Sequence, residues 1–139
     1  MSNNFYWVPV ALTAFDWEKT DYTHTPALRY ENLSALAQLP PATVAARAEI
    51  ATTAQGREIR LHLENSKAEL AFQVRAAVRT TKGDLIAPVF WSDNWIELKP
   101  GEQTTLTALL PADAPETPVV KLDGWNVAAQ TLTPTAAAH

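Results

Sequence analysis

Apolar and polar residues alternate strictly in two stretches near the middle of the chain. Between residues 57 and 64, Ile59, Leu61 and Leu63 are separated by charged residues and a histidine, and between residues 70 and 78 every even-numbered position is apolar. A period of two places one apolar and one solvated face on a β-strand. We therefore predict two strands joined by a turn at residues 64–67, with Ala71 on the solvated face of the second strand.

Shorter apolar runs on both sides predict further strands at residues 42–53, 85–90, 95–98, 104–110 and 119–127. Gly83, and Gly101 after Pro100, stand between these runs, where a tight turn demands a positive φ. The count is about seven short strands at the spacing of an immunoglobulin-like fold. We therefore predict an all-β protein, an immunoglobulin-like β-sandwich whose facing apolar rows form the core.

The first forty residues lack this period. Residues 5–8 have the composition of a lone strand, and residues 16–26 form a polar and aromatic connector. After Glu31 and Asn32, which can cap a helix, Leu33, Leu36 and Leu39 fall on one side of a helical turn that ends before two prolines. This region is expected to be a connector that carries a short helix.

Length, charge and composition narrow the class of protein. With 139 residues, the chain is too short for a complete (β/α)8 barrel, which needs roughly 250 residues. Its net charge of -4 argues against nucleic acid or an anionic membrane as a partner, and no apolar run approaches the roughly 20 residues of a membrane helix. The absence of cysteine excludes disulfides and thiolate metal sites but does not fix the compartment. We expect a soluble chain.

Two stretches have a more particular order of residues than a generic strand requires. They are APVFWSDNWIELKPGE at residues 87–102 and VVKLDGWNV at residues 119–127, preceded by NFYWVPV, FDWEKTDYTHTP and ENLSALAQLPP. Together they resemble the last immunoglobulin-like domain of the exo-β-D-glucosaminidase and β-mannosidase-like enzymes of glycoside hydrolase family 2. The resemblance covers about residues 4–127. His24 departs from it, because a second aromatic residue is expected there.

This resemblance implies a domain organisation and a role. Residues 1–41 would be the last strand of a preceding domain, a connector and a short helix; residues 42–128 would be the sandwich, and residues 129–139 a tail. The family's catalytic glutamates lie in a barrel domain that has no counterpart here. The resemblance thus implies a monomeric, non-catalytic fragment that packs against the barrel and other domains of its parent enzyme, and a secreted or periplasmic parent is compatible with it.

No catalytic, cofactor or metal site is predicted within the chain. Glycoside hydrolysis needs two carboxyl groups roughly 5–9.5 Å apart on a rigid scaffold, whereas Asp16, Glu18 and Asp21 lie on the connector and are interpreted as solvated charges. The histidines at positions 24, 62 and 139 lack metal-ligand spacing, and His62 shares the solvated face of its strand.

The aromatic residues are the candidate contact sites. On one extended strand, Trp91 and Trp95 would face the same side roughly 13 Å apart and could stack two sugar rings, with Asp93 and Asn94 bonding hydroxyls. However, residues 92–94 have turn chemistry, which breaks that geometry. Burial in the core or against another domain is therefore the preferred interpretation of Trp91, Trp95 and Trp125.

The sequence is compatible with more than one function. Trp17 and Tyr22, like Trp7, lie on the connector and would be exposed unless another domain covers them, which favours the accessory-domain hypothesis. The main alternative is a carbohydrate-binding module that uses the loop between Trp91 and Trp95. A third hypothesis is a free-standing adhesive or chaperone-like sandwich that adds a partner strand at an open sheet edge. An independent enzyme is the weakest hypothesis.

Overall fold

The computed structural model describes residues 8–137. The chain divides into two compact units, Met1–Leu39 and Pro40–His139. Each unit is described by itself. The strand predicted at residues 5–8 falls outside this range except for Val8, which belongs to no regular element. Trp7 also lies outside the described residues.

The N-terminal unit contains little regular structure. Strands β1 (Ala14–Phe15) and β2 (Ala27–Arg29) pair antiparallel around the 3-10 helix η1 (Trp17–Lys19). The predicted short helix is present as a second 3-10 helix, η2 (Ser34–Gln38). Asn32 Oδ1 accepts a hydrogen bond from Ser34 N at 2.9 Å, so its side chain satisfies one N–H group at the start of this helix.

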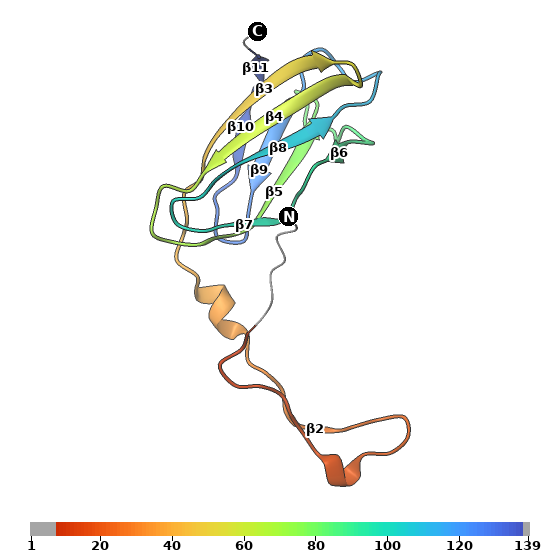
Figure 1. The fold of residues 1–139 in the computed structure, drawn as a ribbon, viewed down its shortest axis with the longest axis vertical. Helices are drawn as coiled ribbons and strands as arrows, with labels where there is room; N and C mark the ends of the chain where they lie inside the picture. Colours follow the sequence, from red (N-terminus) through yellow and green to blue (C-terminus); the bar gives the residue numbers. More distant parts are fainter. Residues whose placement is uncertain (1–7, 138–139) are drawn as a thin grey trace. The chain divides into compact units, whose positions relative to one another are not determined.

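The larger unit is a β-sandwich of two sheets (Figure 1). The first sheet has the order β10-β9-β5-β7, and the second has the order β11-β3-β4-β8-β6. All neighbours pair antiparallel except β11 and β3, which are parallel. The strand bounds are β3 (Ala45–Thr53), β4 (Gly56–Glu64), β5 (Ala71–Arg79), β6 (Phe90–Trp91), β7 (Ile96–Leu98), β8 (Gln103–Leu109), β9 (Val119–Asp123), β10 (Gln130–Leu132) and β11 (Thr135–Ala136). The predicted all-β sandwich is thereby confirmed.

The core lies between the two sheets and uses the predicted apolar rows. From β4 it receives Ile59, Leu61 and Leu63, each at most 2% exposed, and from β5 it receives Val74 and Val78. Burying one such side chain stabilises the fold by roughly 1.5–3 kcal/mol. These rows close the sandwich in a chain that has no disulfide.

The alternation fails at the beginning of β5. Ala71 and Phe72 are consecutive, yet both are buried. The next residue, Gln73, has a φ of 52°, and the register with β7 shifts between Ala71 and Val74. The prediction that Ala71 lies on the solvated face is therefore wrong, because a bulge inserts an extra residue and breaks the period of two.

Two predicted turns have the expected glycines, with a φ of 97° at Gly83 and 77° at Gly101. The second is closed by a hydrogen bond of 3.0 Å from Glu102 N to Lys99 O, and both use the conformation that glycine adopts without a steric penalty.

The later strands differ in extent from the prediction. Residues 85–90 contribute only an isolated bridge between Leu85 and Arg79 and the first residue of β6, and β9 ends at Asp123. Residues 130–132 and 135–136, in the expected tail, form strands of the two sheets.

Candidate functional site

The loop between β6 and β7 does not place its two tryptophans on one strand. Trp91 ends β6 in the five-stranded sheet, whereas Trp95 precedes β7 in the four-stranded sheet and has a φ of 58°. The two-ring geometry of an extended strand is therefore not formed. Trp91 packs against the core, while Trp95 is 54% exposed and Trp125 is also exposed. Of these three residues, only Trp91 is a core-packing residue.

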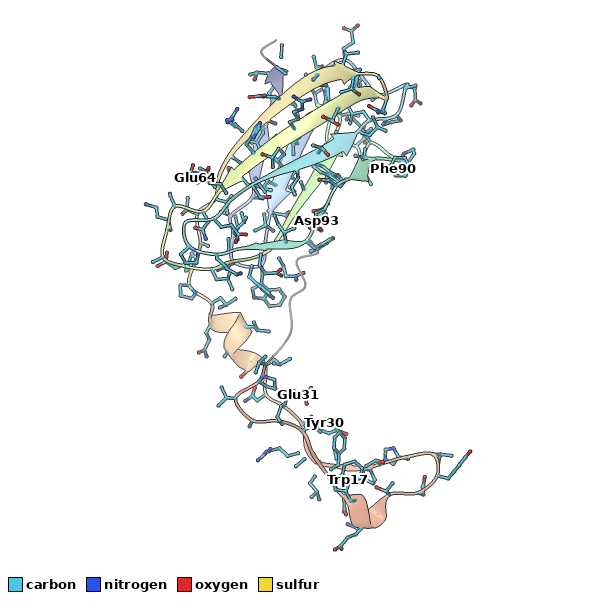
Figure 2. The ribbon with its side chains drawn as sticks, in the orientation of Figure 1. Trp17, Tyr30, Glu31, Glu64, Phe90 and Asp93 are labelled. Carbon is cyan, nitrogen blue, oxygen red and sulfur yellow. The ribbon has the colours of Figure 1, made fainter. Side chains whose placement is uncertain are left out.

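Asn94 is held by the backbone of β5. Its Oδ1 accepts a hydrogen bond from Ala76 N, and its Nδ2 donates to Ala76 O, both at 2.9 Å. Oδ1 also accepts from Trp95 N at 3.0 Å. The amide thus pairs with β5 as a neighbouring strand would, and both of its polar atoms are used. Asp93 is exposed (Figure 2) and accepts a hydrogen bond from Asn94 N at 2.8 Å.

Next to Asn94, an arginine, a tryptophan and an aspartate form an ordered cluster. The Arg75 guanidinium lies 5.1 Å from the centre of the Trp95 ring, which is cation–π distance. Arg75 also donates two hydrogen bonds to the Asp123 carboxylate, at 2.5 and 3.2 Å. These hydrogen bonds lower the pKa of Asp123 and raise the pKa of Arg75. The cluster is therefore ionic at neutral pH.

A depression of about 250 Å³ lies beside this cluster. We name it the Arg75–Trp95 surface and define it by Arg75, Arg79, Leu85, Trp95, Lys121 and Asp123, which line it. These residues come from β5 and β9, from the turn after β5 and from the residue before β7. The Arg79 guanidinium donates a hydrogen bond of 2.8 Å to Gly83 O, which ties its side chain to that turn.

Glu97 is a buried carboxyl group on β7. Its side chain accepts a hydrogen bond of 3.1 Å from Gln73 Nε2, and only 8% of the residue is exposed. Burial raises its pKa, while the hydrogen bond from Gln73 opposes that shift. This group was not singled out by the sequence, because a glutamate between two apolar residues in a short strand has the pattern of a solvated face.

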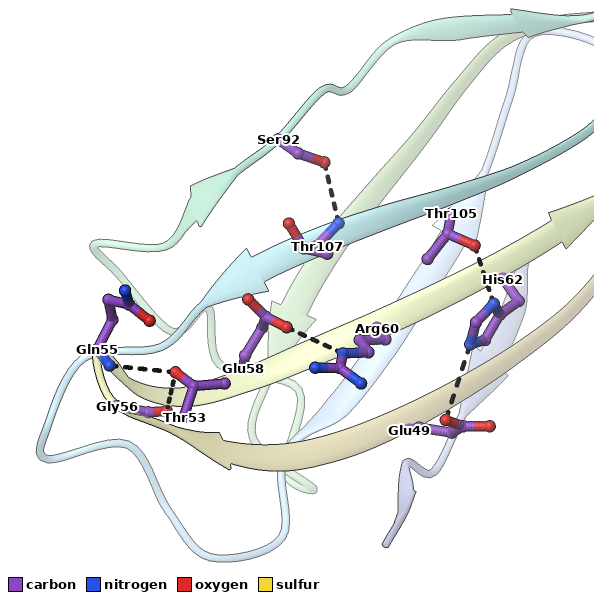
Figure 3. Close-up of polar contacts among 10 residues, drawn as sticks. All are labelled: Glu49, Thr53, Gln55, Gly56, Glu58, Arg60, His62, Ser92, Thr105 and Thr107. Carbon is purple, nitrogen blue, oxygen red and sulfur yellow. Dashed lines mark hydrogen bonds and ion pairs between the residues drawn. The ribbon is translucent and has the colours of Figure 1, made fainter. Parts of the chain in front are cut away.

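The five-stranded sheet carries a row of polar contacts (Figure 3). His62 Nδ1 lies 2.9 Å from Thr105 Oγ1, and Nε2 lies 3.8 Å from a carboxylate oxygen of Glu49. A depression of about 470 Å³ nearby is lined by polar side chains that include Arg47 and Glu64. Among the described residues that line it there is no tryptophan, tyrosine or phenylalanine, so it lacks the large aromatic ring on which a sugar would stack.

The Gly-Trp-Asn motif that follows β9 connects separate parts of the sandwich. Asn126 Oδ1 accepts from Phe72 N at 2.9 Å, and Nδ2 donates to Pro40 O at 2.7 Å and to Leu70 O at 2.8 Å. A Cβ at Gly124 would lie 3.1 Å from Phe72 O. This short distance explains why position 124 is occupied by glycine, which has no Cβ. The three hydrogen bonds explain why position 126 is occupied by asparagine.

Aromatic residues of the N-terminal unit are exposed. Trp17 is 72% exposed and packs its ring 5.5 Å from that of Phe15, Tyr22 is fully exposed, and Tyr30 is also exposed (Figure 2). Nine of the thirteen exposed large hydrophobic residues in the described part of the chain belong to this unit. The unit therefore presents an aromatic and aliphatic surface of the kind that marks an interaction site.

Two carboxylates of the connector, Asp16 and Asp21, are engaged locally. Asp16 accepts a hydrogen bond from Lys19 N at 3.3 Å and forms an ion pair with Lys19 Nζ at 3.0 Å. Asp21 Oδ1 accepts from Thr23 N and His24 N, each at 2.8 Å. The bond from Thr23 N is the largest cause of the lowered pKa of Asp21. These contacts shape turns and do not bring two carboxylates together across a cleft.

Within residues 8–137, no group of three or more His, Asp or Glu residues could hold a metal ion. No helix in the same part of the chain has the length and hydropathy of a membrane span.

The family described as the exo-β-D-glucosaminidase Ig-fold domain matches residues 22–127. The chain belongs to this family. The exo-β-D-glucosaminidase of Amycolatopsis orientalis is 34% identical over 137 residues, which are 95% of this chain and 13% of that protein. The corresponding enzyme of Arthroderma benhamiae is 34% identical over 131 residues, 91% of this chain and 14% of that protein.

The solved structures agree with this assignment. The crystal structure of the Amycolatopsis orientalis exo-chitosanase CsxA matches the Ig-fold domain with a TM-score of 0.78 and 34% identity. The match covers 92% of this chain and 16% of that chain. The Ig-fold domain thus spans less than one sixth of the length of these relatives.

These findings confirm the predicted resemblance to the exo-β-D-glucosaminidases of glycoside hydrolase family 2. They give no support to the β-mannosidase part of that prediction. The candidate residues are distributed over both units of the Ig-fold domain: Trp17 and Tyr22 lie in the N-terminal unit, and Trp91, Asp93, Asn94 and Trp95 lie in the sandwich. Arg75, Glu97 and the role of Asn126 were not predicted from the sequence, because their partners lie far away along the chain.

Proposed function

We propose that this Ig-fold domain is a non-catalytic accessory part of a longer exo-β-D-glucosaminidase, and that it packs against other domains of that enzyme, including the catalytic barrel. The observation that carries the proposal is the exposed set of aromatic and aliphatic side chains on the N-terminal unit. Covering one large apolar side chain contributes roughly 1.5–3 kcal/mol. Covering Trp17, Tyr22 and Tyr30 would therefore contribute several kcal/mol to a contact with another domain.

The small share of the relatives that this chain matches supports the same proposal. It corresponds to 13–14% of two exo-β-D-glucosaminidases, so most of such an enzyme lies elsewhere. Asp16 and Asp21 of the connector are bound within their own turns. The resemblance to the family 2 enzymes implies that the acid/base residue and the nucleophile of the parent enzyme lie in its barrel, and we expect the purified chain to release no aryl alcohol from an aryl β-D-glucosaminide.

Fluorine NMR of the chain labelled with 5-fluorotryptophan tests the packing. The Trp17 signal is assigned from Trp17→Phe, and its accessibility to a soluble paramagnetic reagent is measured before and after adding the remaining polypeptide of the parent enzyme. We expect Trp17 to become protected, while Trp91, which already packs against the core, keeps its low accessibility. Equal exposure of Trp17 in both samples would contradict the proposal.

The carbohydrate-binding alternative has less support. One face of the Trp95 ring is occupied by Arg75, and both polar atoms of the Asn94 amide bind Ala76. Two groups that would hold a sugar are thus already engaged. Titration with chitosan oligosaccharides distinguishes the two functions, because a binding module would show saturable binding that Trp91→Ala combined with Trp95→Ala abolishes.

A further inference from the structure

We propose that the Arg75–Trp95 surface binds a carboxylate-bearing polypeptide segment, and that this segment belongs to another domain of the parent enzyme. The identity of the partner rests on the proposed function, whereas the chemistry of the surface stands on its own residues. The surface lies on the four-stranded sheet of the larger unit and shares no residue with the aromatic surface of the N-terminal unit.

The centre of this surface is rigid before any partner arrives. Trp95 follows Asn94, whose amide is bonded to the backbone of β5. The ring of Trp95 is stacked by Arg75, and Arg75 is in turn fixed by its two hydrogen bonds to Asp123. Tryptophan and arginine are the residues most enriched at the energetic centres of protein interfaces. An immobilised pair loses little conformational entropy on binding, which favours association.

The charge of the surface selects an acidic partner. Arg75, Arg79 and Lys121 carry three positive charges against one negative charge on Asp123, a sum of +2, on a chain whose net charge is -4. Arg79 and Lys121 form no ion pair with any residue between positions 8 and 137. A guanidinium and an ammonium in this arrangement attract carboxylates, and arginine can bind one through two parallel hydrogen bonds.

The size and apolar content of the surface favour a side chain over a small molecule. Its volume of about 250 Å³ is below the roughly 300–1,000 Å³ of typical ligand pockets. Leu85 is 62% exposed and Trp95 54% exposed, so an apolar neighbour of the carboxylate would also find a contact. A segment that alternates acidic and aliphatic side chains fits both properties.

The same charges disfavour an amino sugar. A β-D-glucosaminide carries an ammonium group, which Arg75, Arg79 and Lys121 would repel. The stacked arginine also occupies one face of the Trp95 ring, which is therefore not available to a sugar. The surface is therefore assigned to an acidic polypeptide and not to chitosan.

The first experiment uses the whole chain and tests whether the Arg75–Trp95 surface binds a carboxylate-bearing peptide. The indole N–H signal of Trp95 is assigned with Trp95→Phe and followed by NMR during titration with an acetylated, amidated peptide of alternating glutamate and leucine. A lysine–leucine peptide and a chitosan tetrasaccharide serve as comparison probes. We expect a saturable shift of the Trp95 signal with the glutamate peptide alone and a weaker affinity at higher salt.

Charge-neutralising variants locate the interaction. Arg79→Gln combined with Lys121→Gln removes two positive charges of the surface and should weaken binding of the glutamate peptide about tenfold. A tenfold change in affinity corresponds to about 1.4 kcal/mol. The matched control, Arg60→Gln combined with Lys67→Gln, makes the same charge change away from this surface and should have little effect. Equal weakening by both double variants, an equal response to the lysine peptide, a response to chitosan alone, or no response to any probe would overturn the inference.

The second experiment separates this inference from the proposed function. The same variants are tested for binding to the remaining polypeptide of the parent enzyme, with Trp17 protection as the independent readout. If Trp17 is protected and the Arg79/Lys121 double variant binds as well as the unmodified chain, the inference is wrong and the proposed function holds. If the glutamate peptide binds but Trp17 stays exposed, the surface chemistry is supported and the proposed docking of the N-terminal unit is wrong.

Discussion

Replacing Asn126 by alanine should be among the most damaging single changes outside the apolar core. The side chain accepts one hydrogen bond from Phe72 N and donates two, to Pro40 O and Leu70 O. A neutral hydrogen bond contributes about 0.5–1.5 kcal/mol net, and a buried group that loses its partner costs about 1–3 kcal/mol. Since Phe72 is only 1% exposed, we expect Asn126→Ala to lower the free energy of unfolding by about 2–4 kcal/mol.

Equilibrium unfolding in urea, followed by circular dichroism, measures this loss. With a urea dependence of about 2 kcal/mol per molar, the middle of the range for small domains, the midpoint should fall by about 1–2 M while the slope stays unchanged. Asn32→Ala is the control, because it removes one hydrogen bond to Ser34 N at an exposed helix start and should change stability by less than about 0.5 kcal/mol. If the two variants lose the same stability, Asn126 does not hold these segments together.

Three further changes test the fold and its buried charge. Gly124→Ala places a Cβ 3.1 Å from Phe72 O and should cost about 1–3 kcal/mol; an unchanged thermal midpoint would contradict this. Leu61→Asp buries a charge at a position with 0% exposure, so circular dichroism should show an unfolded chain, whereas Leu85→Asp at an exposed position should stay folded. Glu97→Gln should stabilise the protein at neutral pH, because burial raises the pKa of the folded carboxyl and penalises its ionised form. Urea titrations should show that this advantage disappears as the pH falls below the ordinary value of 4.5, where the unmodified glutamate is protonated in both states; an advantage that persisted there would refute the assignment to ionisation.

The strands with a regular period were predictable because their signal is local. Ile59, Leu61 and Leu63 alternate within one segment, and the sandwich interior buries all three. The bulge at Gln73 was not predictable, since its positive φ accompanies a shift in pairing with β7, which is more than twenty residues away. A local period cannot report a register that depends on a distant partner.

The short strands β10 and β11 illustrate the same limit. They contain two or three residues each, too few to show a period, and their structure comes from pairing with β9 and β3. Hydrophobic pattern therefore located the interior of the sandwich but not all of its edges.

For the candidate site, the sequence predicted the chemistry of the residues but not the residues with which their side chains interact. The sequence indicated a turn at residues 92–94, and the structure places Asn94 in the loop between β6 and β7. It gave no sign that the amide bonds to Ala76, eighteen residues earlier. In the same way, Arg75 is an ordinary polar position of its strand until the fold brings Trp95 and Asp123 beside it.

The parallel pairing of β11 with β3 has a consequence for assembly. Thr135 and Ala136 lie opposite Glu49 and Ile50, and Ala137 N donates a hydrogen bond of 3.0 Å to Ile50 O. These few residues occupy backbone groups that a second molecule could otherwise use to extend the sheet. Removing them would leave a ready template for intermolecular β-pairing, so a trimmed chain should be prone to self-association in concentrated solution.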